Sequence, residues 1–573
     1  MAPAKGIMSP FENLALFRAA SGFGLVASLV AITGGVACTR LETGCEAGPS
    51  CDSDTAQGGE GPSGGMASAG ASPMRSGGAS SGGGGRSSAG GAELGGEGGE
   101  PSQGGDHAGG ASATEAADIS VQGPARLRLR QSTTAEVAIR IARKGEYDGL
   151  VEVSFSNLPS GVVGSSEVLR GTETETTLRL IANEDAVTGG PFSIQLKAAS
   201  LEGQLSSASS LELIVAGKSG SLDGNFHNAG VLFSSSTKPV GMGLDSTGRI
   251  YLASNFIDGS VKYGTVERSS SDGQWELAPV FEPPLSGQLG TDLTAFAMGN
   301  SEVWLGVRGY TVESAASTGL IQLGLDGRLV PAFGSSGFRS TSSDPQYIVP
   351  RPDHGAYLVT EDTASSVLAD GSDADLSLDF RDCTDRLARA SQGRLLLGCL
   401  AGDNTDNQIV RVLPDGSMDG SFGDGGKVLL ETENYLPVLF SLLEASSGDI
   451  FGTYNELIFK LDQQGLAVAD FGQNGLLDPG LGSNLDVMEI QDGLVMFRAY
   501  YRGAPLLRRI DFNGNVDSTF ASGGTLDMTD YLGALDINSA NVTIHSVVED
   551  EAFGRLLIAA DDGKHAFILR FWL

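Results

Sequence analysis

Cationic side chains are scarce in this chain of 573 residues. Lys and Arg together number 37, against 70 Asp and Glu, so the formal net charge is −33. Binding to nucleic acid requires a basic face that neutralises phosphates, and this balance therefore argues against a nucleic-acid partner. The same acidic excess favours solubility.

Histidine is also rare. The five histidines are His107, His227, His354, His545 and His565. None belongs to an HExxH motif and no two stand at metal-ligand spacing, so the sequence shows no histidine constellation for metalloenzyme or hydrolase chemistry. His354, beside Asp353 in a predicted turn, is expected to be a solvated loop residue.

The N-terminal region lacks a hydrophobic run long enough for a comfortable membrane span. The apolar stretch at residues 22–37 is short and rich in glycine, and Lys5 and Arg18 precede it. Residues 1–38 therefore have the form of an export signal.

The end of this signal, Gly35-Val36-Ala37-Cys38, resembles a bacterial lipobox, in which a small residue precedes a cysteine that is lipidated and becomes the mature N-terminus. The resemblance implies lipidation of Cys38, although Gly35 stands where leucine is usual. An ordinary signal peptide or an uncleaved anchor is the alternative. Thr39 follows the cysteine. A residue other than Asp at this position resembles the pattern of lipoproteins that are released to the outer membrane. We therefore expect an exported lipoprotein of a Gram-negative outer membrane or cell surface, held to the membrane by its lipid alone.

Cysteine is sparse as well. Apart from Cys38 the chain has Cys45, Cys51, Cys383 and Cys399, an even number that falls into two local pairs. Export permits disulfides, so Cys45 with Cys51 and Cys383 with Cys399 are candidate bridges. Zinc is disfavoured because there is no CxxC motif and no nearby histidine pair. Free buried thiols are the alternative for the second pair.

Residues 39–116 form a predicted disordered linker. Their Gly, Ser and Ala runs cannot bury a hydrophobic core. About 65 flexible residues reach roughly 40–50 Å, which would lift folded domains clear of lipid headgroups. A G-x-S-x-G match at residues 78–82 lacks the strand and helix that a nucleophile elbow needs, so we ascribe it to chance.

Residues 117–216 change to short alternating strands, which suits a small β-sandwich. The segment Tyr147–Val162 resembles one common in bacterial immunoglobulin-like domains, and the resemblance implies an immunoglobulin-like sandwich that acts as a spacer. The predicted strands are Ile119–Val121, Ala135–Ile141, Leu150–Phe155, Thr176–Ile181, Phe192–Leu196 and Leu211–Val215.

Residues 217–573 are organised by a repeat in which Phe stands six residues after a Gly and a second Gly closes the motif. The clear copies are Gly220 with Phe226, Gly327 with Phe333, Gly416 with Phe422, Gly465 with Phe471 and Gly514 with Phe520. Degenerate copies of the motif, at Gly273 with Phe281 and at Gly371 with Phe380, lie in the two intervals that are about twice as long as the others, from Gly220 to Gly327 and from Gly327 to Gly416. This part of the chain thus contains seven units.

Each unit holds further apolar runs. One follows a turn residue, as in the runs beginning at Gly248, Gly393 and Gly554, and another precedes the next Asp-Gly or Asn-Gly turn. These runs are too short for helices and rich in branched and aromatic residues, so we predict strands. Four strands in about 50 residues make one propeller blade, and blades must stack around an axis to bury both faces.

The pattern G-S-L-D-x-x-F-x-x-x-G, followed by D-x-x-G-R-I-Y-L-A, resembles the delta-60 repeat family, a bacterial β-propeller repeat without an assigned activity. The match covers roughly residues 217–573 and is poor at Gly273 and Gly371, so six to eight blades fit and seven is our prediction. The resemblance implies a β-propeller and supplies no catalytic residues. The predicted fold class is therefore all-β: a disordered tether, an immunoglobulin-like sandwich and a seven-bladed propeller.

Clustered carboxylates give one candidate metal site. Asp370, Asp373, Asp375 and Asp379 have a passing likeness to a calcium loop, but Arg381 stands where the twelfth-position Glu belongs. We therefore expect a solvated loop at a blade edge and no metal or cofactor, with calcium as the alternative. We expect most of the following aromatic residues to belong to the hydrophobic core, with stacking platforms for sugars as the alternative: Trp275, Trp304, Trp572, Tyr500 and Tyr501.

No catalytic or cofactor-binding residue is predicted, and the sequence does not identify a ligand. We expect a non-enzymatic, monomeric envelope or surface protein whose propeller binds or scaffolds protein or polysaccharide. The alternatives are a propeller hydrolase or lyase that attacks a polysaccharide through carboxylates at the central funnel, and a periplasmic scaffold for envelope assembly.

Overall fold

The computed structural model describes residues 116–573 apart from residues 146, 259–260, 278–289, 311–316, 361–362, 379–386, 390–392, 401–406, 431–438, 455 and 500–503. The described residues are almost all in β-strands and turns, with one short α-helix, α1 (Thr529–Gly533), and a 3-10 helix at Ser539–Asn541. None of their helices has the length and apolar character of a membrane span. The predicted signal and linker, with Cys38, Cys45 and Cys51, lie outside the described residues.

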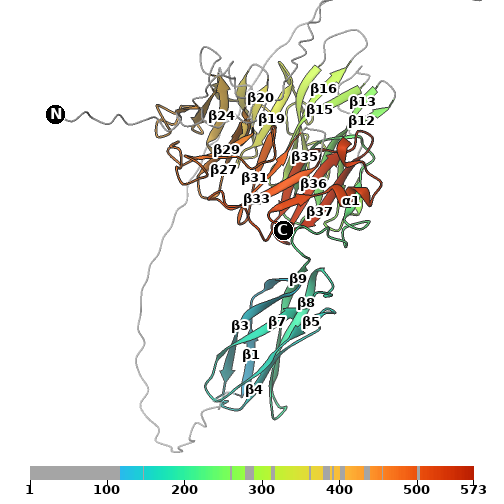
Figure 1. Cartoon of the computed structure of the whole chain (residues 1–573), viewed down its shortest axis with the longest axis vertical. Helices are drawn as coiled ribbons and strands as arrows, with labels where there is room; N and C mark the ends of the chain where they lie inside the picture. Colours follow the sequence, from blue (N-terminus) through green and yellow to red (C-terminus); the bar gives the residue numbers. More distant parts are fainter. Residues whose placement is uncertain are drawn as a thin grey trace, which may run out of the picture. The chain divides into compact units, whose positions relative to one another are not determined.

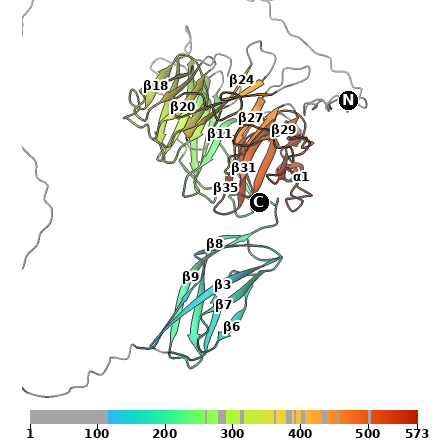
Figure 2. The ribbon, with the colours of Figure 1, turned by 90° about the vertical axis from the view of Figure 1, so that its left-hand side faces the viewer.

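Residues 118–216 form two sheets around one core (Figure 2). The first sheet has the strand order β1-β3-β7-β5, and the second has the order β2-β9-β8-β4-β6, with β2 parallel to β9. Val153, Leu180 and Leu213 are fully buried in the hydrophobic cluster between them. The bounds are β1 (Asp118–Gln122), β2 (Arg126–Arg130), β3 (Thr133–Lys144), β4 (Val151–Ser156), β5 (Val162–Gly164), β6 (Ser166–Leu169), β7 (Glu175–Ala182), β8 (Gly189–Ser200) and β9 (Ser206–Ala216).

The strands that follow form seven four-stranded antiparallel sheets within the described residues (Figure 1). In the first six sheets the strands run in chain order from the innermost to the outermost. All seven runs predicted to follow a turn residue are second strands of these sheets.

The bounds of the first three sheets are β11 (Lys238–Leu244), β12 (Ile250–Asp258), β13 (Val261–Ser269) and β14 (Trp275–Leu277); β15 (Gly290–Met298), β16 (Glu302–Tyr310), β17 (Ser317–Gly324) and β18 (Phe338–Thr341); β19 (Pro345–Pro350), β20 (Ala356–Thr360), β21 (Ala364–Val367) and β22 (Asp373–Leu378). Those of the next three are β23 (Leu387–Arg389), β24 (Leu395–Leu400), β25 (Asn407–Val412) and β26 (Lys427–Leu430); β27 (Leu439–Glu444), β28 (Ile450–Tyr454), β29 (Leu457–Leu461) and β30 (Leu476–Leu477); β31 (Leu485–Ile490), β32 (Gly493–Arg498), β33 (Leu506–Ile510) and β34 (Thr525–Asp527).

The seventh sheet joins the two ends of this part of the chain. Its order is β10-β37-β36-β35, so β10 (Val231–Phe233), which precedes the first sheet in the sequence, pairs with β37 (Ala566–Trp572). The other two strands are β35 (Thr543–Asp550) and β36 (Arg555–Asp561).

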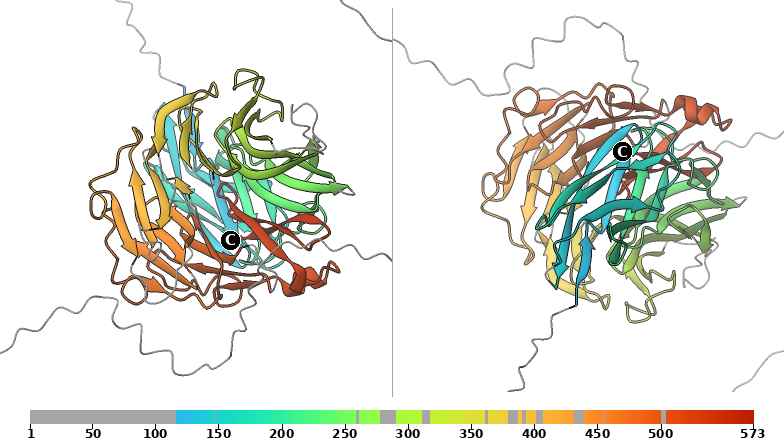
Figure 3. Two further views of the ribbon diagram at one scale, coloured as in Figure 1. Left: turned by 90° about the horizontal axis from the view of Figure 1, so that it is seen from above. Right: turned by 90° about the horizontal axis from the view of Figure 1, so that it is seen from below.

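The sheets close into a ring. The innermost strands contact one another in the order β11, β15, β19, β23, β27, β31 and β35, and β35 contacts β11 again. Seen along the axis, the sheets follow one another around a centre in sequence order (Figure 3). The described residues therefore form a closed, β-propeller-like ring.

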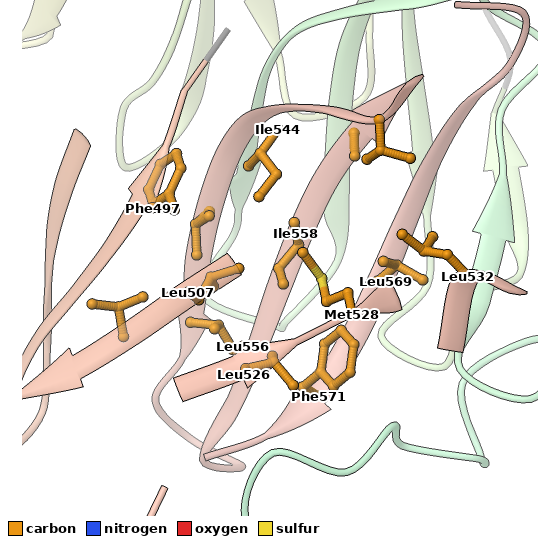
Figure 4. Close-up of a cluster of buried hydrophobic side chains, with 14 of the residues drawn as sticks. Phe497, Leu507, Leu526, Met528, Leu532, Ile544, Leu556, Ile558, Leu569 and Phe571 are labelled. Atoms are coloured by element: carbon orange, nitrogen blue, oxygen red, sulfur yellow. The ribbon is translucent and has the colours of Figure 1, made fainter. Parts of the chain in front are cut away.

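Hydrophobic clusters fill the spaces between neighbouring sheets. One joins the sixth and seventh sheets, where Phe497 and Leu526 face Leu556 and Phe571, and Leu532 of α1 packs against the same cluster (Figure 4). Every residue of β36 is buried. Strands covered on both faces in this way explain the unbroken apolar runs of the sequence.

The antiparallel order gives the ring two different ends. The turns between first and second strands and the links between third and fourth strands, which contain the repeat motifs, lie at one end, the repeat face. The turns between second and third strands and the connections between sheets, such as residues 234–237, 342–344, 528–542 and 562–565, lie at the other end, the loop face.

Candidate functional site

The repeat glycines all make the same turn. Their φ angles are +75° at Gly220, +79° at Gly327, +86° at Gly416, +83° at Gly465 and +87° at Gly514, a region that glycine enters without strain. The degenerate copies at Gly273 and Gly371 have φ angles of +86° and +82°. They therefore keep the turn, while Phe281 and Phe380 lie outside the described residues.

Five of the seven repeat glycines, namely Gly220, Gly273, Gly371, Gly465 and Gly514, also lie against the repeat of the preceding sheet. A Cβ atom added to Gly273 would stand 2.7 Å from the ring of Phe226, and one added to Gly465 would stand 2.8 Å from the ring of Phe422. The backbone N–H of His227 donates to Asp272 O at 2.9 Å and completes the first of these contacts. Glycine is thus required for its φ angle and because the neighbouring sheet leaves no room for a side chain.

The repeat phenylalanines anchor the links between third and fourth strands. All five are buried: Phe226, Phe333, Phe422, Phe471 and Phe520. The closing glycine folds back onto each one, as the Gly426 N–H does when it donates to Phe422 O at 2.8 Å. The motif is therefore a compact turn built on a buried ring.

The Asp of the repeat motif forms ion pairs with two arginines in the sheet that closes the ring. Asp223, three residues after Gly220, lies 2.8 Å from Arg570 of β37 and 3.0 Å from Arg555 at the start of β36. All three side chains are buried. Burial, reinforced by the charge of Arg555, lowers the pKa of Arg570 to about 10. The guanidinium of Arg570 also stacks 4.3 Å from the centroid of Phe226.

The same arrangement recurs in the fourth sheet. Asp419 lies 2.8 Å from Arg411 and 3.7 Å from Arg394, and Arg394 reaches Glu444 of the fifth sheet at 3.1 Å. Burial alone would raise the pKa of Asp419, but hydrogen bonds from Ser421 and the charge of Arg411 outweigh it, so the pKa lies below its ordinary value.

Two units that lack this Asp also have a residue other than Arg at the partner position on the third strand. Val468 replaces the Asp in the fifth sheet, where the third-strand cation is Lys460, and Lys460 pairs with Asp449 at the start of the second strand at 2.9 Å. Val330 replaces it in the second sheet, where the third-strand residue is the neutral Gln322. The backbone bond between the two positions, Val330 N–H to Gln322 O at 3.0 Å, is kept, as it is between Asp419 and Arg411. In these two units, the loss of the repeat Asp is therefore accompanied by the loss of the third-strand Arg.

The cations bind the neighbouring sheet as well as their own. Arg411 Nη1 donates to Gln463 O at 2.7 Å, and Lys460 Nζ donates to Phe512 O at 2.9 Å. Both carbonyls belong to the turn that precedes the next repeat glycine. We call this set of repeat Gly, Phe and Asp with its Arg or Lys partner the inter-sheet latch; its residues hold sheets together and are occupied in doing so.

Carboxylates of the innermost strands serve a similar purpose in the described part of the ring. Glu489 accepts the Ser446 N–H at 2.8 Å, and Glu549 accepts the Gln491 N–H at 2.8 Å. Each bond joins one innermost strand to the preceding sheet. Burial raises the pKa of Glu549. Among the described residues, no three His, Cys, Asp or Glu side chains are grouped so that they could hold a metal ion.

One buried pair was not predicted from the sequence. His545 Nε2 lies 2.5 Å from Asp561 Oδ2, and both side chains are buried. His545 stands at a register shift between β35 and β36, where a bulge re-aims its side chain. No motif joins the two residues, and the weak signal available was a His inside an apolar strand.

The candidate disulfide and calcium sites are described in part. Cys399 is disulfide-bonded, whereas its predicted partner Cys383 lies outside the described residues, so that pairing stays a prediction. Asp370 accepts hydrogen bonds from the N–H and Oγ of Ser372 at 2.8 and 2.6 Å, and Asp373 pairs with Arg339. Asp379 and Arg381 lie outside the described part.

The candidate aromatic platforms are mostly core residues. Trp304 and Trp572 are fully buried, which confirms the expected core position and excludes the platform alternative for both. Trp275 Nε1 donates to Phe233 O at 2.9 Å and its ring packs against the cluster between the seventh and first sheets. Tyr500 and Tyr501 lie outside the described residues. His354 occupies the turn between β19 and β20 with its side chain 60% exposed, as the sequence predicted.

Comparison with known proteins shows little. No protein-family model matches the chain and no curated protein matches it at a significant level. A eukaryotic initiation factor aligns with a TM-score of 0.31 and 10% identity, over 57% of this chain and 72% of that one. A gluconolactonase from Xanthomonas campestris aligns with a TM-score of 0.23 and 12% identity, over 66% of this chain and 82% of that one. Both scores lie below 0.5, so the propeller-like assignment rests on the sheet topology given above.

Proposed function

We propose that this chain is a lipid-anchored envelope or cell-surface protein of a Gram-negative bacterium, with a non-enzymatic ring that binds or scaffolds protein or polysaccharide. In this proposal Cys38 carries the lipid, residues 39–116 are a flexible tether and the protein is a monomer. The seven sheets are the blades of a propeller with delta-60-like repeats, and residues 117–216 are an immunoglobulin-like domain.

The observation that carries the binding role is the difference between the two faces of the ring. On the repeat face, the recurring polar residues are engaged in the inter-sheet latch, as Arg411 is with Asp419 and Gln463. On the loop face, the connections differ from sheet to sheet. Residues 342–344 suffice between β18 and β19, whereas residues 528–542 between β34 and β35 contain α1 and a 3-10 helix.

A rigid frame of repeated units that carries differing loops is the usual arrangement of a recognition module. Two carboxylates of the innermost strands, Glu489 and Glu549, bond to the backbone of neighbouring sheets, which fits a structural role. The loop face is therefore the surface that we assign to the partner.

The test is retention of the chain that lacks residues 1–38 on envelope fractions and on immobilised surface polysaccharide. A bulky polyethylene glycol is attached through Lys564→Cys in a loop-face turn or, as the matched control, through Gln464→Cys in a repeat-face turn, with Cys45 and Cys51 replaced by Ser. We expect retention that the label at 564 abolishes and the label at 464 leaves intact. Absence of retention on every surface, or equal loss with both labels, would refute the proposal.

A further inference from the structure

Strand β2 of the sandwich has an alternating sequence, Arg126-Leu127-Arg128-Leu129-Arg130, at the edge of its sheet. Leu129 is buried in the sandwich core and Leu127 packs against it. Because successive side chains of a strand point to opposite faces, the three arginines share the outer face. An edge strand exposes unpaired backbone groups, and an arginine-rich one discourages pairing with other strands.

All three arginines contact the end of the seventh sheet. Arg128 Nη2 donates to Glu551 O, and Arg130 Nη2 donates to Leu573 O at 2.6 Å. The guanidinium of Arg126 lies 5.8 Å from the centroid of Phe553. Burial, together with the charges of Arg509 and Arg128, lowers the pKa of Arg130.

Apolar and polar contacts flank these arginines. Ile214 and Ala216 at the end of β9 form a buried cluster with Trp572, and Phe553 packs against it. On another side, Asn225 Nδ2 donates to Thr188 O at 2.6 Å. A Cβ atom on Gly217, in the short link after β9, would lie 2.5 Å from Trp572, so the link itself is packed.

We propose that β2 is a docking strand: the sandwich braces the closing sheet of the ring, and the two move as one body. Arg555, which holds Asp223 at the closure, stacks between Phe553 at 4.5 Å and Trp572 at 4.7 Å. Both aromatic residues are touched by the sandwich. The sandwich thus stabilises the ion pair of Arg555 with Asp223 through these two aromatic residues. This role does not depend on which partner the ring binds.

Reporter amides for this brace lie at the closure. The Trp572 N–H donates to Ser221 O at 2.9 Å, and the Leu573 N–H donates to Gly554 O at 3.0 Å. Hydrogen exchange of the full chain, followed by mass spectrometry, measures how often these bonds open. Peptides from β16 and β20 of the ring and from β4 of the sandwich report whether both parts remain folded.

The test variant is Arg128→Glu with Arg130→Glu. Its control is Arg140→Glu with Arg179→Glu, which makes the same charge change on the sandwich's other sheet, where the paired side chains are exposed. Loss of two hydrogen bonds from charged donors should speed exchange at residues 551–554 and 570–573 by at least about tenfold. The control should leave these amides unchanged, and β16, β20 and β4 should keep their protection in both variants.

Equal exchange in the test and control variants would overturn the proposal, because the arginines would then support nothing at the closure. Faster exchange spread evenly over all sheets would overturn it as well, since the effect would not be local. Arg128→Met with Arg130→Met removes the donors without reversing charge, and it must show the same local pattern. A neutral variant that exchanges like the native chain would contradict the brace.

Discussion

Replacing Asp223 with Asn should loosen the ring at its closure. Asp223 is fully buried and lies 2.8 Å from Arg570 and 3.0 Å from Arg555, so the variant leaves two buried guanidinium groups with less compensating charge. Breaking a buried ion pair from one side costs about 3–5 kcal/mol. Asp550 remains 3.9 Å from Arg555, so we expect a value near the lower end, about 3 kcal/mol.

This free energy converts to a melting shift through the unfolding entropy. At about 2 cal/mol/K per residue, a ring of roughly 350 residues gives about 0.7 kcal/mol/K, so Asp223→Asn should lower Tm by about 4 °C. The matched control is Asp517→Asn, because Asp517 pairs with one arginine, Arg509, at 3.1 Å and is partly exposed. Its expected loss is about 1 kcal/mol, or roughly 1–2 °C.

Differential scanning calorimetry of the full chain distinguishes the two variants. The expected order of Tm is native chain, then Asp517→Asn, then Asp223→Asn. Equal shifts for both variants, or an unchanged Tm for Asp223→Asn, would refute the view that the buried carboxylate secures the closure.

Two further predictions concern the inter-sheet latch. Gly465→Ala should destabilise the ring by at least about 2 kcal/mol, because its φ is +83° and the new Cβ would lie 2.5 Å from Val428. Gly420→Ala, with open space around it, should be near neutral in the same denaturant titration, and similar losses at both sites would contradict the packing argument. Because the pKa of Asp419 is lowered in the folded chain, its contribution to stability is complete above the unfolded value of about 4 and is lost as pH falls through the folded pKa. Asp419→Asn should therefore lower Tm at pH 7, and the difference from the native chain should shrink below about pH 4; a constant difference down to pH 2.5 would count against this assignment.

The ring could be predicted from the sequence because its signals are local. Gly416 and Phe422 belong to one turn, and the period with which that turn recurs indicates the stack of sheets. The ion pair of Asp223 with Arg555 joins residues from the beginning and the end of the sequence segment that forms the ring, so a local sequence pattern could not reveal it. A trace is present in retrospect, because the units with Val330 or Val468 in place of Asp also lack the third-strand Arg.

The sandwich shows the same limit. Six of its nine strands follow from alternation, whereas β5 and β6 are too short to carry a period. Strand β2 alternates as well but was not predicted, and nothing in the local sequence indicates that its arginines meet Glu551 and Leu573. The His545–Asp561 pair depends on a register shift that no sequence pattern marks.

Protease treatment of intact cells tests the central claim of anchoring and surface display most directly. The native chain is compared with Cys38→Ala, and the ring fragment is followed with an antibody. We predict that the native ring is cleaved from intact cells and that the Cys38→Ala chain appears in soluble fractions. Protection of the native chain until the outer membrane is broken would contradict surface display, and equal fractionation of both chains would contradict the lipid anchor.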